Sequence, residues 1–247
     1  MKFSYTYAIF LASLLLTACQ QTEVKNSETL NINTVSASVE DPISPIKYEF
    51  PTTDYAWTNN YDTDQALAHR IQAPTGYTRK PNSQVSFSHW LRGIPVLPGR
   101  PEVLLYNGHR KGNQSAHFAV VDIDGGDKDL QQCADAVMRM RAEYLFARDA
   151  KEELHFNFTS GEVAKWSDWS EGIRPKFYKS GDRWNVKFKA GHLKSDSHDN
   201  LMAYLQKVYT WAGTASLDHE LKSVPLGELH SGDVFIQGGF PGHAVLV

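Results

Sequence analysis

Cys133 and His243 are the two residues whose chemical types best suit covalent catalysis in this chain of 247 residues. A cysteine thiolate is a strong nucleophile, and it is commonly activated by a histidine base that lies nearby in space. Asp129 followed by Gln132 fits a capping box, which predicts that a helix over 130–148 begins here. Cys133 then lies at the end of the first turn, where free backbone amides and the helix dipole favour the thiolate.

The same two residues also have a purely structural interpretation, which the sequence leaves open. Cysteine is among the most buried residue types and packs as a small apolar side chain. Ala134 and Val137 provide an apolar helix face beside Cys133. His243 taken alone is more often a packed core or surface histidine than a catalytic base, so each residue gains weight only through the other.

Hydrophobic periodicity predicts the elements that must position these side chains. The helix over 130–148 and a second helix over 199–211 have apolar residues at helical spacing. His243 begins an apolar strand over 243–247, which follows a turn rich in glycine and proline. The shorter elements expected are helices over 62–71 and 87–92, a hairpin over 103–106 and 117–123, and strands over 154–158 and 184–188. This mixture predicts an α+β fold, and a folded part over 47–247 suits a single domain.

Two short segments resemble the papain-like cell-wall amidopeptidases of the NlpC/P60 and CHAP type. They are the helix start that carries Cys133, and the sequence from Gly232-Asp233-Val234-Phe235-Ile236 to Gly242-His243 with its Ala and Val run. The resemblance implies a papain-like fold, in which a helix packs on an antiparallel sheet. It also implies Cys133 as nucleophile, His243 as general base and Gln132 as an oxyanion or orienting group, although helix capping explains Gln132 equally well. The family's Asp-Cys-Ser or Asn-Cys pattern is missing here, and the third triad residue would lie beyond Val247.

Three segments carry a second resemblance that covers nearly the whole folded part. They are 86–92, the helix sequence over 129–136 with 141–145, and 232–239. They are similar to a family of uncharacterised bacterial lipoproteins, catalogued as domain of unknown function 4846. This resemblance implies a family and no reaction. Its members continue past Val247, and this chain stops within an apolar strand, so we expect the sequence to be truncated at its C-terminus.

The N-terminus resembles a bacterial lipoprotein signal. Lys2 precedes an apolar run over 7–16 that is too short to span a bilayer, and Leu16-Thr17-Ala18-Cys19 resembles a lipobox. We therefore expect residues 1–18 to be a signal peptide and Cys19 to be acylated, which would anchor the protein to a lipid bilayer. Residues 19–46 are polar and contain two prolines, which is typical of a flexible tether. Gln20 favours the outer membrane of the bacterial envelope, facing the periplasm.

Charge and residue spacing exclude several other classes of function. Removal of residues 1–18 takes away Lys2 and changes the formal net charge from −3 to −4, so the basic footprint of a nucleic-acid-binding protein is absent. The acidic segment over 122–129 fails the calcium-loop pattern, and no cysteine pair or spaced histidines suit zinc. We expect no metal and no other cofactor. Asp135 and Glu143 share the first helix, but their spacing does not support a glycosidase pair.

Trp166, Trp169 and Arg174 form a possible ligand platform. Two tryptophans could stack on a sugar, while the guanidinium could bind a carboxylate such as that of a muropeptide. Tryptophans so spaced are more often packed in a core or at its rim.

Together these features predict a membrane-anchored envelope lipoprotein with a Cys-His site that cleaves an amide or peptide bond, with peptidoglycan as a candidate substrate. The alternative is a non-catalytic envelope lipoprotein that binds a glycan or a protein partner.

Overall fold

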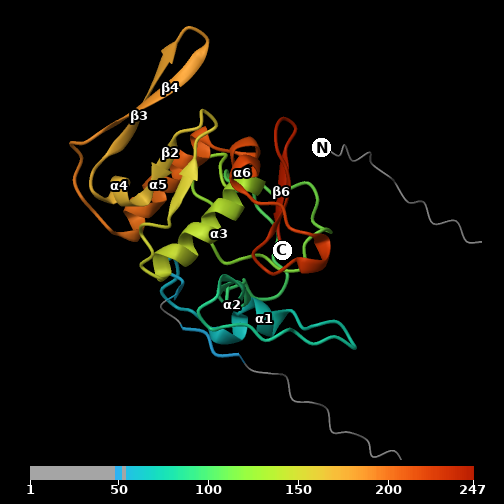
Figure 1. Ribbon diagram of the computed structural model, residues 1–247. Helices are drawn as coiled ribbons and strands as arrows, with labels where there is room; N and C mark the ends of the chain where they lie inside the picture. The colour runs from blue at the N-terminus through green and yellow to red at the C-terminus, as the bar shows by residue number, and fades with distance from the viewer. Residues whose placement is uncertain (1–47, 52–53) are drawn as a thin grey trace, which may run out of the picture. The chain divides into compact units, whose positions relative to one another are not determined.

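The computed structural model describes residues 48–51 and 54–247 (Figure 1). The expected signal peptide over 1–18, the tether over 19–46 and the lipidation site at Cys19 lie outside the described residues. None of the helices in the described part combines the length and the apolar character needed to cross a membrane.

The described part is a single domain of mixed α+β structure. Its helical elements are η2 (Thr63–Gln65), α1 (Leu67–Arg70), α2 (Phe87–Arg92), α3 (Cys133–Ala147), α4 (Trp166–Ser170), α5 (His198–Trp211), α6 (Thr214–Glu220) and η3 (Leu226–Glu228). Its strands are β1 (His155–Asn157), β2 (Val163–Lys165), β3 (Arg174–Ser180), β4 (Arg183–Lys189), β5 (Val234–Gln237) and β6 (His243–Leu246). In the described residues the strands pair antiparallel as three two-stranded sheets, β1 with β2, β3 with β4 and β5 with β6.

The main core forms around α3 and α5, and β1, β2 and β6 add to it. The apolar residues of α5 recur at helical spacing, and Leu201, Leu205 and Val208 are fully buried. Ser197 caps this helix by accepting a hydrogen bond from the backbone N–H of Asn200. A second aromatic cluster, centred on Tyr55 and Trp90, packs against Tyr144 of α3. Because α3 contacts both clusters, it is the central element of the domain.

Most of the expected elements are present, and three differ from expectation. The helix expected over 62–71 is divided into η2 and α1, because the backbone of Ala66 is extended and forms a β-bridge with Pro95. The helices over 87–92 and 199–211 and the last strand are confirmed to within a residue. The expected hairpin over 103–106 and 117–123 is wrong, because Leu104 and Val121 form only isolated β-bridges, with Arg110 and Val96 respectively. Several apolar side chains of the two segments, such as Leu104 and Phe118, are exposed, although Val121 packs against the cluster of Tyr55 and Trp90. A pair of strands that buries little apolar surface gains little stability from pairing.

The expected helix over 130–148 is shorter at its N-terminus, where α3 begins at Cys133 and its N-cap is Gln132. Gln131 has a φ of +57°, which interrupts the helix before that position. The Asp135 carboxylate accepts a hydrogen bond from the backbone N–H of Gln132 at 3.3 Å, so the helix is capped three residues later than expected. Asp129 accepts instead from the Gln132 side chain, at 3.4 Å.

Leu205→Ala should lower the free energy of unfolding by about 2–5 kcal/mol, because the side chain is fully buried and its loss leaves a cavity in the main core. Leu193→Ala is the matched control, since that leucine is 91% exposed and its truncation should change stability by less than about 0.5 kcal/mol. Urea denaturation followed by circular dichroism measures both. Equal effects of the two substitutions would contradict the placement of α5 in the core.

Candidate functional site

Cys133 is the first residue of α3, and its thiol is free and partly buried against the main core. This position belongs to the first helical turn, whose backbone N–H groups have no partner within the helix. The left-handed backbone of Gln131 sets where the helix begins, and so places Cys133 at its tip. The structure therefore moves the thiol from the end of the first turn to its start.

His243 is the first residue of β6 and lies opposite Gln237 of β5. Its side chain is exposed, whereas the next residue, Ala244, is buried in the main core. β6 packs directly against α3, so the structure brings together the two elements that carry Cys133 and His243 (Figure 1). In the described part of the chain no hydrogen bond joins the sulfur of Cys133 to the His243 ring.

A buried charged network runs along the other side of α3. Nε of Arg139 donates to Oε1 of Glu143 at 2.6 Å, and these side chains are only 2% and 1% exposed. Nε2 of His198, at the start of α5, lies 2.9 Å and 3.0 Å from the two carboxylate oxygens of Glu143. A carboxylate only accepts hydrogen bonds, so Nε2 of His198 is the donor in both contacts.

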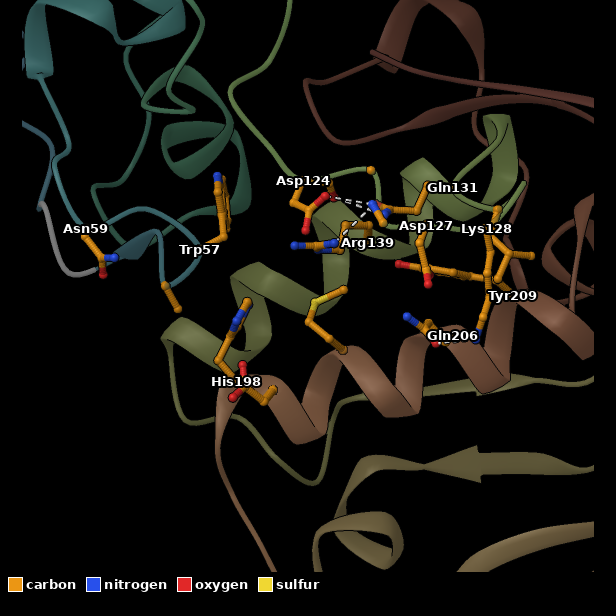
Figure 2. Close-up of a pocket in the computed structure, with 16 residues that line it drawn as sticks. Trp57, Asn59, Asp124, Asp127, Lys128, Gln131, Arg139, His198, Gln206 and Tyr209 are labelled. Carbon is orange, nitrogen blue, oxygen red and sulfur yellow. Dashed lines mark hydrogen bonds between the residues drawn. The ribbon is translucent and has the colours of Figure 1, made fainter. Parts of the chain in front are cut away.

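Gln131 extends this network to the segment before α3. Its side chain accepts a hydrogen bond from Nη1 of Arg139 at 3.1 Å and donates one to the backbone oxygen of Asp124 at 3.1 Å. Figure 2 shows these two bonds as dashed lines from the end of the Gln131 side chain, one to Asp124 and one to Arg139. The terminal amide of Gln131 is thus held by one bond to its oxygen and one from its nitrogen, beside the unusual backbone conformation that precedes α3.

A cavity of about 310 Å³ lies beside the network. Arg139 and His198 line it, Trp57 lies on one side, and Gln206 and Tyr209 of α5 lie on another (Figure 2). Three exposed carboxylates also line it, those of Asp124, Asp127 and Asp199. None of the described lining residues is a serine, threonine or cysteine.

The Tyr209 hydroxyl is a buried polar group at this cavity. Tyr209 is only 5% exposed, and its hydroxyl has no partner at hydrogen-bond geometry, although Arg139 lies near. Burial raises the pKa of Tyr209 far above its usual range, so the group remains a neutral hydroxyl. A buried hydroxyl without a partner costs free energy, which a bound polar ligand would recover.

Trp166 and Trp169, the expected platform, lie in the α4 helix, where their side chains are 0% and 7% exposed. The guanidinium of Arg174 stacks on Trp169, 3.9 Å from the ring centre. It also donates to Oδ1 of Asn200 at 3.2 Å. All three side chains therefore pack with other protein groups, and the two indole rings face the core.

The amino-acid sequence matches the model of one protein family over residues 67–247, described as a domain of unknown function (4846). The chain belongs to the DUF4846 family. No curated protein and no solved structure matches it. The DUF4846 match covers α1 to β6 and therefore includes Cys133, His243 and the charged network. The described residues of this DUF4846 domain contain no group of three or more His, Cys, Asp or Glu side chains placed to hold a metal ion.

Sequence reasoning missed Arg139, Glu143 and His198 as members of one site. The available signal was the spacing of Asp135, Arg139 and Glu143, which recur every four residues and so share one helix face. Charges of alternating sign at this spacing usually indicate a solvated face, yet in the DUF4846 domain all three are buried. His198 carried no such signal, because it joins the network only through the packing of α5 on α3.

Burial raises the pKa of Asp135 from its usual 3.8 to about 6, against hydrogen bonds from the backbone N–H groups of Gln132 and Gln131, which lower it. Between about pH 4 and pH 6 the folded protein then holds a proton that the unfolded chain releases, so stability falls as pH rises through this window. Above this window both states are ionised and the dependence ends. The Asp135→Asn variant lacks this titrating group and serves as the reference. We expect the free energy of unfolding of the wild type, minus that of the variant, to fall from pH 4 to pH 6.5 and then to stay level. Urea titrations at half-unit pH intervals measure this difference, and parallel pH profiles would contradict it.

Glu143→Gln should lower the free energy of unfolding by about 3–5 kcal/mol, because it leaves the Arg139 guanidinium buried without its counter-charge. Glu152→Gln removes the same charge from an exposed position and should change stability by less than about 0.5 kcal/mol. Thermal and urea unfolding of the two variants supply the comparison. A Glu143→Gln protein as stable as the control would show that the ion pair is not a structural constraint.

Proposed function

We propose that this protein is a membrane-anchored lipoprotein of the bacterial cell envelope that hydrolyses an amide or peptide bond with Cys133 and His243. The observation that carries the proposal is the packing of α3, which begins with the only free cysteine described, against β6, which begins with His243. The order of the two residues and their elements is that of the papain-like amidopeptidases. This supports a papain-like architecture beyond the α+β class itself.

The proposed reaction uses each residue in a defined role. His243 takes the proton of the Cys133 thiol, and the thiolate attacks the carbonyl carbon of the scissile amide. The imidazolium then gives this proton to the leaving amine, which leaves an acyl group on the sulfur. A water molecule, deprotonated by His243, hydrolyses this thioester and restores the thiol. Backbone N–H groups at the start of α3, with the Gln132 side chain, are the candidate donors to the oxyanion.

The arrangement of the two side chains is compatible with this chemistry. His243 is exposed and so accessible to a substrate, and Cys133 is only partly buried. Catalytic hydrogen bonds are often long in the absence of substrate, and the sulfur and imidazole are required to meet only when the substrate binds. The lipobox at Cys19 would place this site in the envelope, where the peptide bonds of peptidoglycan are the candidate substrate.

A second function, non-catalytic binding of a glycan, is favoured by the cavity beside Arg139. The unsatisfied Tyr209 hydroxyl, the rim carboxylates and the nearby Trp57 are groups that bind sugar hydroxyls and rings. The cavity volume of about 310 Å³ suits a small ligand. Glycan binding needs no thiol, so experiments that alter Cys133 distinguish this function from the catalytic one.

Alkylation by iodoacetamide tests the catalytic proposal. In the full chain with Cys19→Ser, Cys133 is the only thiol, and we expect it to react at pH 7 at least tenfold faster than the same chain with His243→Ala. His109→Ala is the matched control, because it removes another exposed histidine and should leave the rate unchanged. The Cys133→Ser protein should release no new peptides from purified peptidoglycan in mass spectrometry, whereas the chain with Cys133 intact should.

Two results would overturn the catalytic proposal. One is a folded protein whose Cys133 reacts no faster than it does in the His243→Ala variant. The other is a failure to cleave amide bonds of peptidoglycan under conditions where the thiol is reactive. A protein that fails both assays but gains thermal stability from peptidoglycan sugars, with the gain lost in Tyr209→Phe, would support the binding function.

A further inference from the structure

The hairpin of β3 and β4 concentrates positive charge in an acidic protein. Residues 174–189 contain six basic residues and one acidic residue, a net charge of +5, whereas the whole chain has a formal net charge of −3. The basic residues are Arg174, Lys176, Lys179, Arg183, Lys187 and Lys189. In Figure 1 the hairpin extends away from the helices, with its turn at the far end.

The strand register places like charges directly opposite each other. Lys176 pairs with Lys187, and Arg174 pairs with Lys189, so all four start from the same face of the hairpin. We call this the cationic face, and Arg183, opposite Ser180, belongs to it as well. Opposed like charges destabilise a strand pair. In the described residues no acidic side chain forms an ion pair with a lysine of this face.

The other face of the hairpin fixes its position on the domain. The Phe177 ring stacks on Trp211 at the end of α5, with 3.7 Å between ring centres, and Trp184 meets the same indole edge-on at 5.1 Å. Because these contacts hold the opposite face, Lys176, Lys187, Lys189 and Arg183 of the cationic face are exposed, whereas Arg174 at its base packs on Trp169. Tyr178 lies among its lysines and is 38% exposed, with Nζ of Lys187 located 5.0 Å from its ring centre.

We propose that the cationic face binds the surface of a bilayer that contains anionic phospholipid. Charge complementarity supports this partner, since unneutralised lysines opposite each other gain most from a dense layer of phosphate groups. An exposed aromatic residue adds the second feature of an interfacial surface, since Tyr178 starts from the cationic face and is 38% exposed. Such rings favour the headgroup region of a membrane.

Co-sedimentation with vesicles tests this proposal. The full chain with Cys19→Ser, which cannot be acylated there, is mixed with vesicles of phosphatidylcholine alone or with phosphatidylglycerol. Each lysine near an anionic surface contributes roughly fivefold to partitioning, so Lys176→Gln with Lys187→Gln should weaken binding to the anionic vesicles by about 25-fold. Raising the salt from about 0.05 M to 0.5 M should weaken the binding of the parent chain in the same way.

The matched control is Lys111→Gln with Lys222→Gln, which removes the same two charges from exposed positions elsewhere and should leave binding unchanged. The Lys176 and Lys187 double variant should unfold at the same or a higher temperature than the parent, because it relieves like-charge repulsion, and this excludes misfolding as the cause of lost binding. Three results would overturn the proposal: equal binding to neutral and anionic vesicles, equal losses in both double variants, or binding to an anionic cell-wall polysaccharide without binding to vesicles.

Discussion

The buried ion pair between Arg139 and Glu143 is the interaction on which the arrangement of the domain depends. Two charges that are almost fully removed from water are tolerated only when each has close hydrogen-bonding partners. Glu143 therefore also binds His198, and Arg139 also binds Gln131. Through His198 the ion pair helps to determine where α5 packs on α3. Through Gln131 it helps to determine where α3 begins. The network thus couples local helix geometry to tertiary structure.

The start of α3 follows from this constraint. The terminal amide of Gln131 accepts a hydrogen bond from Arg139 and donates one to the Asp124 backbone, which helps to keep the Gln131 backbone in the left-handed region. The helix consequently begins at Cys133. The proposed nucleophile and the charged network lie on different sides of α3, so the ligand cavity beside Arg139 and the proposed Cys133–His243 site are separate features of one helix. The β3–β4 hairpin is a third feature, attached through Trp211 at the far end of α5.

Sequence patterns were most informative where a segment buries one regular face. The residues of α5 alternate between core and solvent with helical period, and both α2 and the last strand are bounded by glycine or proline, so their limits could be predicted. The apolar segments over 103–106 and 117–123 were misleading, since a strand requires a partner and a core face, and neither is encoded locally. The cap of α3 was predicted three residues early, because Asp129 and Asp135 both provide a suitable carboxylate and only the network selects the second.

The sequence by itself determined the DUF4846 family, the α+β class, the presence of a helix with Cys133 near its N-terminus and the strand that begins with His243. These features depend on local periodicity, turn residues and short motifs, which the chain carries within a few residues of each position. Only the tertiary structure decided that Asp135, Arg139 and Glu143 are buried, that His198 completes their network, and that Trp166 and Trp169 face the core. Whether a charged or aromatic residue is buried depends on which distant segment covers it. In this protein α5 and the segment before α3 provide that cover.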